Sequence, residues 1–252
     1  MEPAIRTRNL MKSFGAVVAA RDVNVDILPG TISGLIGTNG AGKTTFINML
    51  TGYLRPDSGS ITLDGTEIVG LTSREITRLG VARSFQIPQL FNTLSAIESL
   101  ELALAAQQAR GLRGFALVSE DELEARAVEL LKEFGLEGFA NSLAGTLPEG
   151  IRKLLDIAIA MARSPRVLFL DEPTSGVAAE EKFAIMDRVI AAARHTGLTV
   201  LFVEHDMEIV RRYSDRVLAF FEGRVLIDDK PDVVLSDTQV RTLIIGEEPA
   251  HA

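Results

Sequence analysis

The stretch GTNGAGKTT, Gly37 to Thr45, decides the expected fold, because it fits the pattern G-x-x-x-x-G-K-[ST] of a phosphate-binding loop. The apolar run TISGLIG that leads into it predicts a strand buried on both faces, and KTTFINMLTG after it predicts a helix that ends at Gly52. In this context, backbone N–H groups and the helix N-terminus would face the phosphates. We expect Lys43 to add a full positive charge and Thr44 to place its hydroxyl on Mg²⁺.

Two adjacent carboxylates end a second predicted strand in VLFLDEPTS, Val167 to Ser175. Such charges about 4 Å apart repel by roughly 4 kcal/mol at the effective dielectric of a protein surface, so they need a cation or a reaction to serve. At this place, enzymes with a phosphate-binding loop hold the Mg²⁺ water shell, which we expect of Asp171. We expect Glu172 to polarise the water that attacks the γ-phosphate. Without the loop, a solvated carboxylate at the start of a turn would explain Glu172 equally well.

Composition excludes several classes of protein. The 252-residue chain is 46% hydrophobic, so it can bury a full core. A formal net charge of -8 argues against nucleic acid as a main partner, and the absence of cysteine excludes disulfides and thiolate metal sites. The charged N-terminus predicts no secretory signal, and the longest apolar run, Leu154 to Ala162, contains Asp156 and is too short to span a bilayer. We therefore expect the chain in the cytoplasm, with membrane contact only through a partner.

Helical patterns replace strand patterns between about residues 95 and 163, which predicts an inserted helical subdomain. Within it, Ser119 and Glu122 have capping-box spacing at the start of an amphipathic helix. After Pro165, strand and helix patterns alternate again and predict a parallel α/β arrangement. RVLAFF and RVLIDD predict a terminal hairpin, and we expect the last residues, through IIGEEPAHA, to be polar and mobile.

These motifs resemble, in order and over nearly the whole chain, those of the ATP-binding subunits of ABC transporters. GTNGAGKTT is similar to the family's phosphate loop, VLFLDEPTS to its acidic strand with the catalytic glutamate, and FVEHD to its switch strand, which here ends in His205. GVARSFQIPQLF resembles the Q-loop and contains Gln86. SFG places Phe14 where the family stacks an aromatic ring on adenine.

The resemblance implies a set of site residues. The catalytic residues would be Glu172, His205 and Gln86, and the metal ligands would be Thr44, Gln86 and Asp171. The nucleotide would be bound by Phe14, Gly37, Thr38, Asn39, Gly40, Ala41, Gly42, Lys43, Thr44, Thr45 and Gly150. Two of these residues have purely structural alternatives. His205 could be a strand-end histidine that hydrogen-bonds a neighbouring carbonyl, and the ring of Phe14 could pack in the core.

The resemblance also implies the fold. We expect an α/β P-loop NTPase core, in which a mainly parallel sheet carries helices on both faces, with an antiparallel β subdomain and an inserted helical subdomain. All of residues 1–252 would form a single ATP-binding domain. Residues 1–86 and 165–230 would form the nucleotide-binding core with the β subdomain, residues 87–164 the helical subdomain, and residues 231–252 a C-terminal helix and tail.

The chain departs from the family's pattern at two places. The loop that usually resembles LSGGQ, and that closes over the ATP of the opposite subunit, reads LPEGIRK here; it keeps Gly150, but Pro148 removes a hydroxyl donor. Thr146 and Glu149 stand in capping-box spacing, which predicts a capped helix start. At the second place, Ala178 stands where the family often has an aspartate that couples the two sites. Both departures bear on dimer closure and hydrolysis rate more than on nucleotide binding.

Within the family, GVARSFQIPQLF, the helical insert and FANSLAGTLPEGIRK most resemble the branched-chain amino acid importers. This implies Mg²⁺-dependent ATP hydrolysis in a dimer with a second ATP-binding subunit, identical or related, on transmembrane permease subunits at the inner face of the cell membrane. Ile87, Leu90 and Phe91 could receive a permease helix or pack within the subdomain. Two alternatives stay open: a low-turnover regulatory module that binds nucleotide, and an ABC ATPase of another system, including those that act on DNA or ribosomes.

Overall fold

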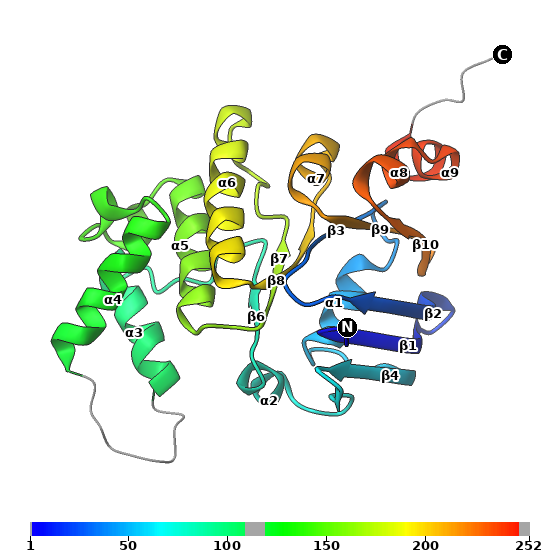
Figure 1. Ribbon diagram of the computed structural model, residues 1–252, viewed down its shortest axis with the longest axis horizontal. Coiled ribbons are helices and arrows are strands. Elements are labelled where there is room, and N and C mark those ends of the chain that lie inside the picture. Colours follow the sequence, from blue (N-terminus) through cyan, green and yellow to red (C-terminus); the bar gives the residue numbers. More distant parts are fainter. Residues whose placement is uncertain (1, 109–118, 247–252) are drawn as a thin grey trace. The chain divides into compact units, whose positions relative to one another are not determined.

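The structure of the protein is a computed structural model that describes residues 2–108 and 119–246 (Figure 1). The chain divides into two compact units: unit 1 contains residues 1–81 and 197–252, and unit 2 contains residues 82–196. Of the C-terminal end that we expect to be mobile, residues 247–252 lie outside the described residues. Among the helices within the described ranges, none has the length and hydrophobicity to cross a bilayer.

Unit 1 contains an antiparallel sheet with the strand order β2-β1-β4-β5 (Figure 1). Its strands are β1 Ile5–Phe14, β2 Val17–Ile27, β4 Ser58–Leu63 and β5 Thr66–Glu67. Along β2, Val23, Val25 and Ile27 are buried and alternate with more exposed polar residues, as expected of a strand with one face in the core. The early strand and the antiparallel β subdomain predicted from the sequence are confirmed.

The phosphate-binding loop follows β3, which has a parallel neighbour on either side and is buried along its whole length. The strand order here is β10-β9-β3-β8, with bounds β3 Ile32–Gly37, β8 Thr199–Val203, β9 Arg216–Phe221 and β10 Arg224–Asp229. Strands β9 and β10 form the predicted antiparallel hairpin. Helix α1, Lys43–Leu50, starts directly after the loop, and its Phe46 ring lies 5.2 Å from the ring of Phe220, centroid to centroid. This aromatic contact ties α1 to β9.

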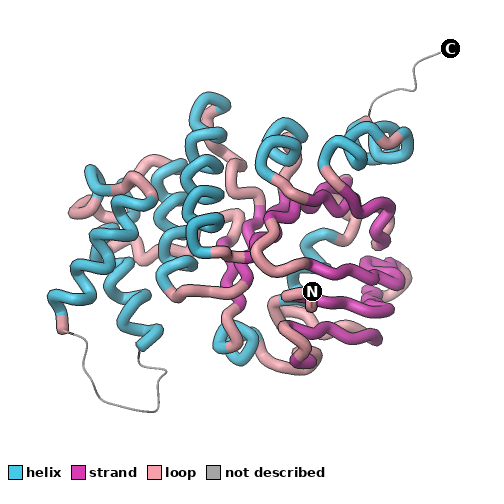
Figure 2. Tube along the Cα trace, in the orientation of Figure 1, coloured by secondary structure: helices cyan, strands magenta, loops and turns pink. Residues whose placement is uncertain are grey.

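The other helices of unit 1 are short (Figure 2). Helix α2, Ser73–Arg78, carries a complete capping box, in which Thr72 and Glu75 each accept a hydrogen bond from the other's backbone N–H. The remaining helices are α7 Met207–Tyr213, α8 Pro231–Ser236, α9 Thr238–Val240 and the π-helical turn Arg241–Ile245.

Unit 2 is mainly helical, as predicted for residues 95 to 163. Its strands are β6 Val81–Ser84 and β7 Val167–Asp171, which are neighbours in the strand order. Its helices are α3 Ala96–Gln108, α4 Glu120–Glu133, α5 Glu149–Ala162 and α6 Ala179–Thr196, with 3-10 turns Glu137–Phe139 and Ala144–Thr146. Helix α3 packs against both α4 and α5.

Helix α4 has the predicted amphipathic character. Ser119 is its N-cap, and the hydroxyl of Ser119 accepts a hydrogen bond from the backbone N–H of Glu122 at 3.2 Å. On the predicted apolar face, Leu123 is half-buried and the others are fully buried: Ala127, Leu130, Leu131 and Phe134. The face therefore belongs to the core of unit 2.

The predicted cap of α5 by Thr146 is wrong. Helix α5 begins at Glu149 with Pro148 as its N-cap residue, and the hydroxyl of Thr146 donates instead to the carbonyl of Leu143 at 2.8 Å. The reason is Pro148, because a residue that precedes proline is disfavoured in the α conformation. Leu147 is accordingly extended, with φ −72° and ψ 146°, so the helix cannot begin before the proline. The N-terminus of α5 consequently lacks a side-chain cap.

Candidate functional site

The phosphate-binding loop is shaped by glycines that no other residue could replace. Gly42 has φ 103°, in the left-handed region, and a Cβ there would overlap the carbonyl oxygen of Ala19. Gly37 is equally confined, because its Cβ would overlap the carbonyl oxygen of Phe220. The loop backbone is therefore packed directly against backbone of β2 and β9, which fixes the direction of its N–H groups.

Lys43 is the first residue of α1, and its side chain is almost fully buried. The Lys43 ammonium donates hydrogen bonds to the carbonyl of Gly37 at 2.6 Å and to that of Thr38 at 3.0 Å. Its charge therefore lies within the loop, where a phosphate would bind. Thr44, the next residue, is exposed.

The turn of the β9–β10 hairpin hydrogen-bonds the phosphate-binding loop. This contact was not predicted from the sequence. The N–H of Gly223 donates to the carbonyl of Ala41 at 2.9 Å, and the N–H of Arg21 donates to the carbonyl of Gly223 at 2.7 Å. One glycine thus links the loop to β2. The Glu222–Gly223 pair marked the turn in the sequence, but nothing local indicated what the turn would contact.

His205 lies at the edge of the sheet where the phosphate-binding loop begins. Leu35 of β3 is in register with Val203 of β8, and the two strands are parallel, so His205 follows β8 at the level where Gly37 ends β3. The side chain of His205 is exposed, and its backbone N–H donates to the carboxylate of the buried Glu204 at 3.2 Å. This position agrees with the predicted γ-phosphate role, which stays a prediction.

Phe14 ends β1 and is 52% exposed, so it is not the core residue that the structural alternative required. The Lys12 ammonium lies 5.6 Å from the centre of the Phe14 ring and pairs with the carboxylate of Asp57 at 2.7 Å. A large aromatic ring at the surface leaves apolar area in contact with water, which is unfavourable unless a ligand covers the ring. Adenine stacking on Phe14 stays a prediction.

The two adjacent acids lie at the end of β7 in unit 2, and each has a partner from the segment that follows the start of β6. Arg83 pairs with Asp171, with 2.9 Å between Nη2 and Oδ2. The amide of Gln86 donates to the carboxylate of Glu172 at 2.8 Å. The predicted Q-loop glutamine therefore meets the predicted catalytic glutamate, whereas Arg83 did not figure among the residues expected from the sequence.

Glu172 has a strained backbone. Its φ of 49° lies in the left-handed region, which is uncommon for a long side chain and costs on the order of 1 kcal/mol or more. The Lys153 ammonium donates to the carbonyl of Glu172 at 3.0 Å and helps to hold this conformation. Such strain is typical of functional positions, where the surrounding structure fixes the orientation of a side chain.

Asp156 of α5 holds the Q-loop segment through both of its carboxylate oxygens. The hydroxyl of Ser84 donates to one oxygen at 2.6 Å, the N–H of Gln89 donates to the other at 3.1 Å, and the N–H of Phe85 also donates to this carboxylate. Burial raises the pKa of Asp156 above its usual range, although these three hydrogen bonds and the nearby charge of Lys153 oppose the rise.

The signature-like loop LPEGIRK leads into α5. Gly150, in its first turn, is half-buried, and a Cβ at this position would lie 3.3 Å from the side chain of Ile185 and 3.5 Å from that of Glu181. Ala178 immediately precedes α6, and its carbonyl accepts the N–H groups of Glu181 and Lys182. Ala178 therefore contributes to the start of α6 through its backbone carbonyl, and this contact does not involve its side chain.

The predicted site residues fall in both units. Unit 1 contains Phe14, Gly37, Thr38, Asn39, Gly40, Ala41, Gly42, Lys43, Thr44, Thr45 and His205. Unit 2 contains Gln86, Gly150, Asp171 and Glu172. Contacts that link these residues within a unit include those of Lys43 with Gly37 and Thr38 and that of Gln86 with Glu172.

A profile of the ABC transporter family matches residues 20–175, which include the phosphate-binding loop, the Q-loop and both acids. The chain belongs to the ABC transporter family. The high-affinity branched-chain amino acid transport ATP-binding protein LivG of Escherichia coli K12 is 34% identical over 252 residues, which cover 98% of this chain and 99% of LivG. The predicted ABC membership is thus confirmed.

Solved structures of ABC cassettes share the fold. The ADP conformation of MJ1267, an ATP-binding cassette of an ABC transporter, has a TM-score of 0.85 and 29% identity, and the match covers 98% of this chain and 100% of that one. A dimeric post-hydrolysis state of the ATP-binding cassette MJ0796, bound to ADP and Pi, has a TM-score of 0.78 and 27% identity over 90% of this chain and 98% of that one. The predicted α/β P-loop NTPase fold and ATPase class are confirmed.

The residues present fit a nucleotide together with Mg²⁺. The glycine loop around Lys43 offers backbone N–H groups and a cation to phosphates, as the family's nucleotide sites require. In the described part of the chain, no group of three or more His, Cys, Asp or Glu side chains gathers to hold a metal ion. Asp171, at the end of β7, offers one carboxylate, and proteins usually bind Mg²⁺ with one or two carboxylates plus water and substrate phosphates.

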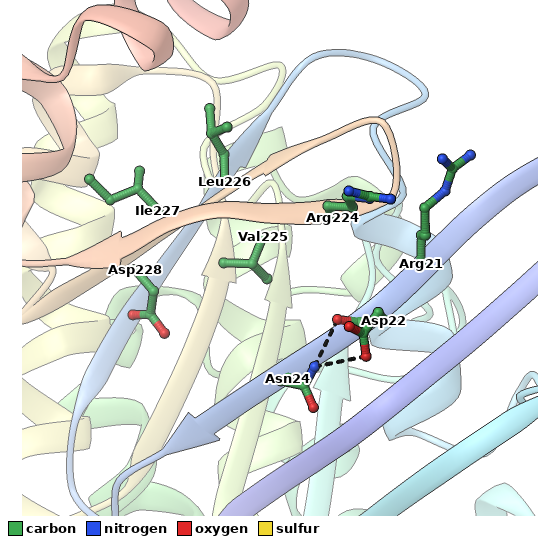
Figure 3. A pocket seen from close by; sticks show the side chains of 8 residues that line it. All are labelled: Arg21, Asp22, Asn24, Arg224, Val225, Leu226, Ile227 and Asp228. Carbon is green, nitrogen blue, oxygen red and sulfur yellow. Dashed lines mark hydrogen bonds between the residues drawn. The ribbon is translucent and has the colours of Figure 1, made fainter.

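A separate pocket of about 410 Å³ lies between β2 and β10 of unit 1 (Figure 3). Its two aspartates have partners within the protein: Asp22 accepts a hydrogen bond from the Asn24 amide, and Asp228 pairs with Arg216. The eight residues that line it include none of the residues predicted for the site. This pocket is therefore not part of the predicted nucleotide site.

Proposed function

We propose that the protein is the ATP-hydrolysing subunit of an ABC importer for branched-chain or related amino acids. The observation that carries this proposal is the similarity to E. coli LivG, because it spans 98% of this chain and 99% of LivG. End-to-end similarity at this level includes the Q-loop and the helical segment as well as the phosphate-binding loop, which every P-loop enzyme has. It therefore supports a shared transport role beyond a shared nucleotide site.

In this function, Lys43 and the loop N–H groups bind the β- and γ-phosphates, and Phe14 stacks on adenine. Thr44, Gln86 and Asp171 are the residues that would hold Mg²⁺, which would supply positive charge to the phosphate oxygens. The strained backbone of Glu172 and its contact with Gln86 support a fixed orientation for the catalytic carboxylate.

Hydrolysis then forms a bond from water oxygen to the γ-phosphorus and breaks the bond to the ADP oxygen. Glu172 orients the water and accepts its proton, and His205 contacts the γ-phosphate. Gly150 and the start of α5 face the nucleotide of a second cassette, identical or related. The dimeric cassette MJ0796 bound to ADP and Pi supports this arrangement by its similarity to the chain.

The proposed partners at the membrane are the transmembrane permease subunits of the importer. Ile87 is 73% exposed and Phe91 is 64% exposed, whereas Leu90 between them is half-buried. Packing within unit 2 therefore does not account for Ile87 or Phe91, and two exposed apolar side chains next to Gln86 suit the docking of a permease helix. Through this contact the subunit would sit in the cytoplasm against the inner face of the membrane.

A low-turnover regulatory module is the second candidate, and the start of α5 favours it. Pro148 replaces a serine of the usual signature, so the loop offers one hydroxyl donor fewer to the opposite nucleotide. ATP turnover with and without the co-purified permease distinguishes the two candidates. The importer subunit should be stimulated by the permease, whereas a regulatory module should stay slow in both conditions.

The proposed roles of the two acids are tested by conservative variants. Asp171→Asn should impair Mg²⁺-dependent ATP binding, whereas Glu172→Gln should bind ATP but fail to hydrolyse it. Glu133→Gln, an exposed position at the end of α4, is the control and should behave like wild type. Normal turnover in Glu172→Gln would contradict the catalytic role.

Glu172→Gln also tests the dimer. Hydrolysis reopens the family's ATP sandwich, so this variant with ATP should accumulate a dimer in size-exclusion chromatography with light scattering. A variant that binds ATP but remains monomeric would show that the isolated cassette does not close. Reverting Pro148→Ser together with Glu149→Gly in that background then separates a defective loop, which the reversion repairs, from a missing partner, which it does not.

A further inference from the structure

Arg83 is the residue that compensates the charge of Asp171 in the described structure. The ion pair is nearly enclosed, since the Arg83 side chain is 9% exposed and the Asp171 side chain is 16% exposed. A carboxylate this buried next to a second carboxylate would be costly without a nearby cation. Arg83 supplies that cation from the neighbouring strand β6, three residues before Gln86.

The guanidinium of Arg83 is held in place from a second side. Its central carbon lies 4.9 Å from the centre of the Phe85 ring, which is within the range of a cation–π contact. A planar guanidinium held by a ring and an acid has little rotational freedom, so it defines the position of the carboxylate it contacts. The contact with Asp171 uses Oδ2 and leaves Oδ1 for another ligand.

We propose that Arg83 is a positioning residue that holds the carboxylate of Asp171 ready for Mg²⁺. The inference rests on the proposed function, in which Asp171 serves the metal. Residues that hydrogen-bond a metal ligand orient it, and their loss typically lowers metal affinity about 10- to 100-fold. Because Arg83 occupies one oxygen of Asp171, it can remain in place while the other oxygen serves the metal or its water.

The test compares the affinity of a non-hydrolysable fluorescent ATP analogue with Mg²⁺ and with EDTA. The dissociation constant in EDTA divided by that in Mg²⁺ measures how strongly the metal supports nucleotide binding. This ratio does not depend on turnover. Arg83→Met retains most of the side-chain volume without the charge and should lower this ratio about tenfold, while binding in EDTA stays as in wild type. Arg83→Lys retains the charge without the planar group and should restore part of the ratio.

Two further variants make the result specific. Arg188→Met removes an arginine of the same unit that donates to the carbonyl of Phe134, and it should leave the ratio unchanged. In an Asp171→Asn background, Arg83→Met should have no further effect, because the carboxylate that it positions is gone. A ratio that stays normal in Asp171→Asn refutes the metal role of Asp171, and with it the proposed function of that residue.

If Asp171→Asn lowers the ratio but Arg83→Met does not, only the positioning role is overturned. An increased ratio in Arg83→Met also overturns it, because Arg83 would then compete with the metal. Equal losses in Mg²⁺ and in EDTA would assign Arg83 a merely structural role and equally reject the proposal. If Arg83→Met does not fold, Arg83→Lys decides: a several-fold lower ratio supports the proposal and an unchanged ratio rejects it.

Discussion

Asp156→Ala should free the Q-loop segment from α5. The wild-type carboxylate accepts three hydrogen bonds, from the hydroxyl of Ser84 and from the N–H groups of Phe85 and Gln89. Alanine accepts none of them. Ser84 is almost fully buried and Gln89 N–H lies at a part-buried contact, so water replaces the lost acceptor poorly.

The magnitude follows from these three donors. Each donor left without an acceptor costs about 1–3 kcal/mol when it is buried, and the removal of a desolvated charge offsets part of that sum. We expect a net local destabilisation of about 2–3 kcal/mol, which corresponds to roughly 30- to 150-fold faster hydrogen exchange at the two amides. The effect should be confined to the segment from Ser84 to Gln89 and to neighbouring turns of α5.

Asparagine should be far better tolerated than alanine at this position. Its amide oxygen can accept from a backbone N–H, and its amide N–H₂ can donate to the hydroxyl of Ser84, which is able to accept as well as donate. Asp156→Asn should therefore retain most of the protection of Gln89. It also removes the carboxyl group whose charge depends on pH.

The pH dependence has a definite sign. Because the pKa of Asp156 is raised, chiefly by burial, the native protein retains this proton to higher pH than the unfolded chain does. The associated stability is complete below about pH 4 and is lost as pH rises through the folded-state pKa. The free-energy difference between wild type and Asp156→Asn should therefore shift in favour of the variant as pH rises through the folded-state pKa of Asp156.

Hydrogen exchange with mass spectrometry measures both effects on peptides that cover residues 84–89, and urea unfolding at several pH values supplies the second readout. Asp121→Ala, at an exposed position in the first turn of α4, is the control and should leave this peptide protected. Unchanged exchange in Asp156→Ala would refute the reasoning. A difference between wild type and Asp156→Asn that does not vary with pH would refute the burial argument.

The remaining predictions concern nucleotide binding, each measured by calorimetric titration with ATP. Lys43→Ala should sharply reduce affinity, since the loop loses its own full positive charge; near-normal binding would contradict its role. Phe14→Ala should weaken ATP binding by about 1–3 kcal/mol, while Phe14→Tyr should be tolerated. An unchanged affinity in Phe14→Ala would contradict adenine stacking on Phe14. Gly42→Ala should abolish binding because its Cβ would overlap the carbonyl of Ala19, whereas Gly40→Ala, with open space around the added carbon, should lose less.

The nucleotide core could be predicted from the sequence because its signals are local. A strand, a glycine loop and a helix follow one another directly around Lys43, and the terminal hairpin is marked by its own turn. The first strand, Ile5–Phe14, has a weak signal in the sequence for an equally local reason. Ile5 and Thr7 are buried in alternation, but Asn9 has φ 48° and shifts the register, so the next buried residue is Leu10. A bulge of this kind breaks the alternation on which strand prediction depends.

The partners of Asp171 and Asp156 could not be predicted, because each partner is distant from its acid in the sequence. Arg83 is 88 residues from Asp171, and Asp156 is 72 residues from Ser84. In the sequence, Arg83 is one charge beside Gln86, and Asp156 only argues against a membrane span. A charge inside a short apolar run does indicate that a partner must exist, since a buried charge is rarely left unpaired. Its identity depends on the fold.

Helix α5 explains why these distant contacts matter together. Lys153 and Asp156 are three residues apart and so lie on one face of the helix, from which Lys153 reaches the carbonyl of Glu172 and Asp156 reaches the Q-loop backbone at Gln89. A displacement of α5 should therefore move the backbone of Glu172 and the Q-loop together. The same helix begins within the altered signature, with Pro148 as its N-cap residue. A loose Q-loop in Asp156→Ala should consequently lower ATP turnover more than ATP affinity, because Lys43 and the phosphate-binding loop belong to the other unit.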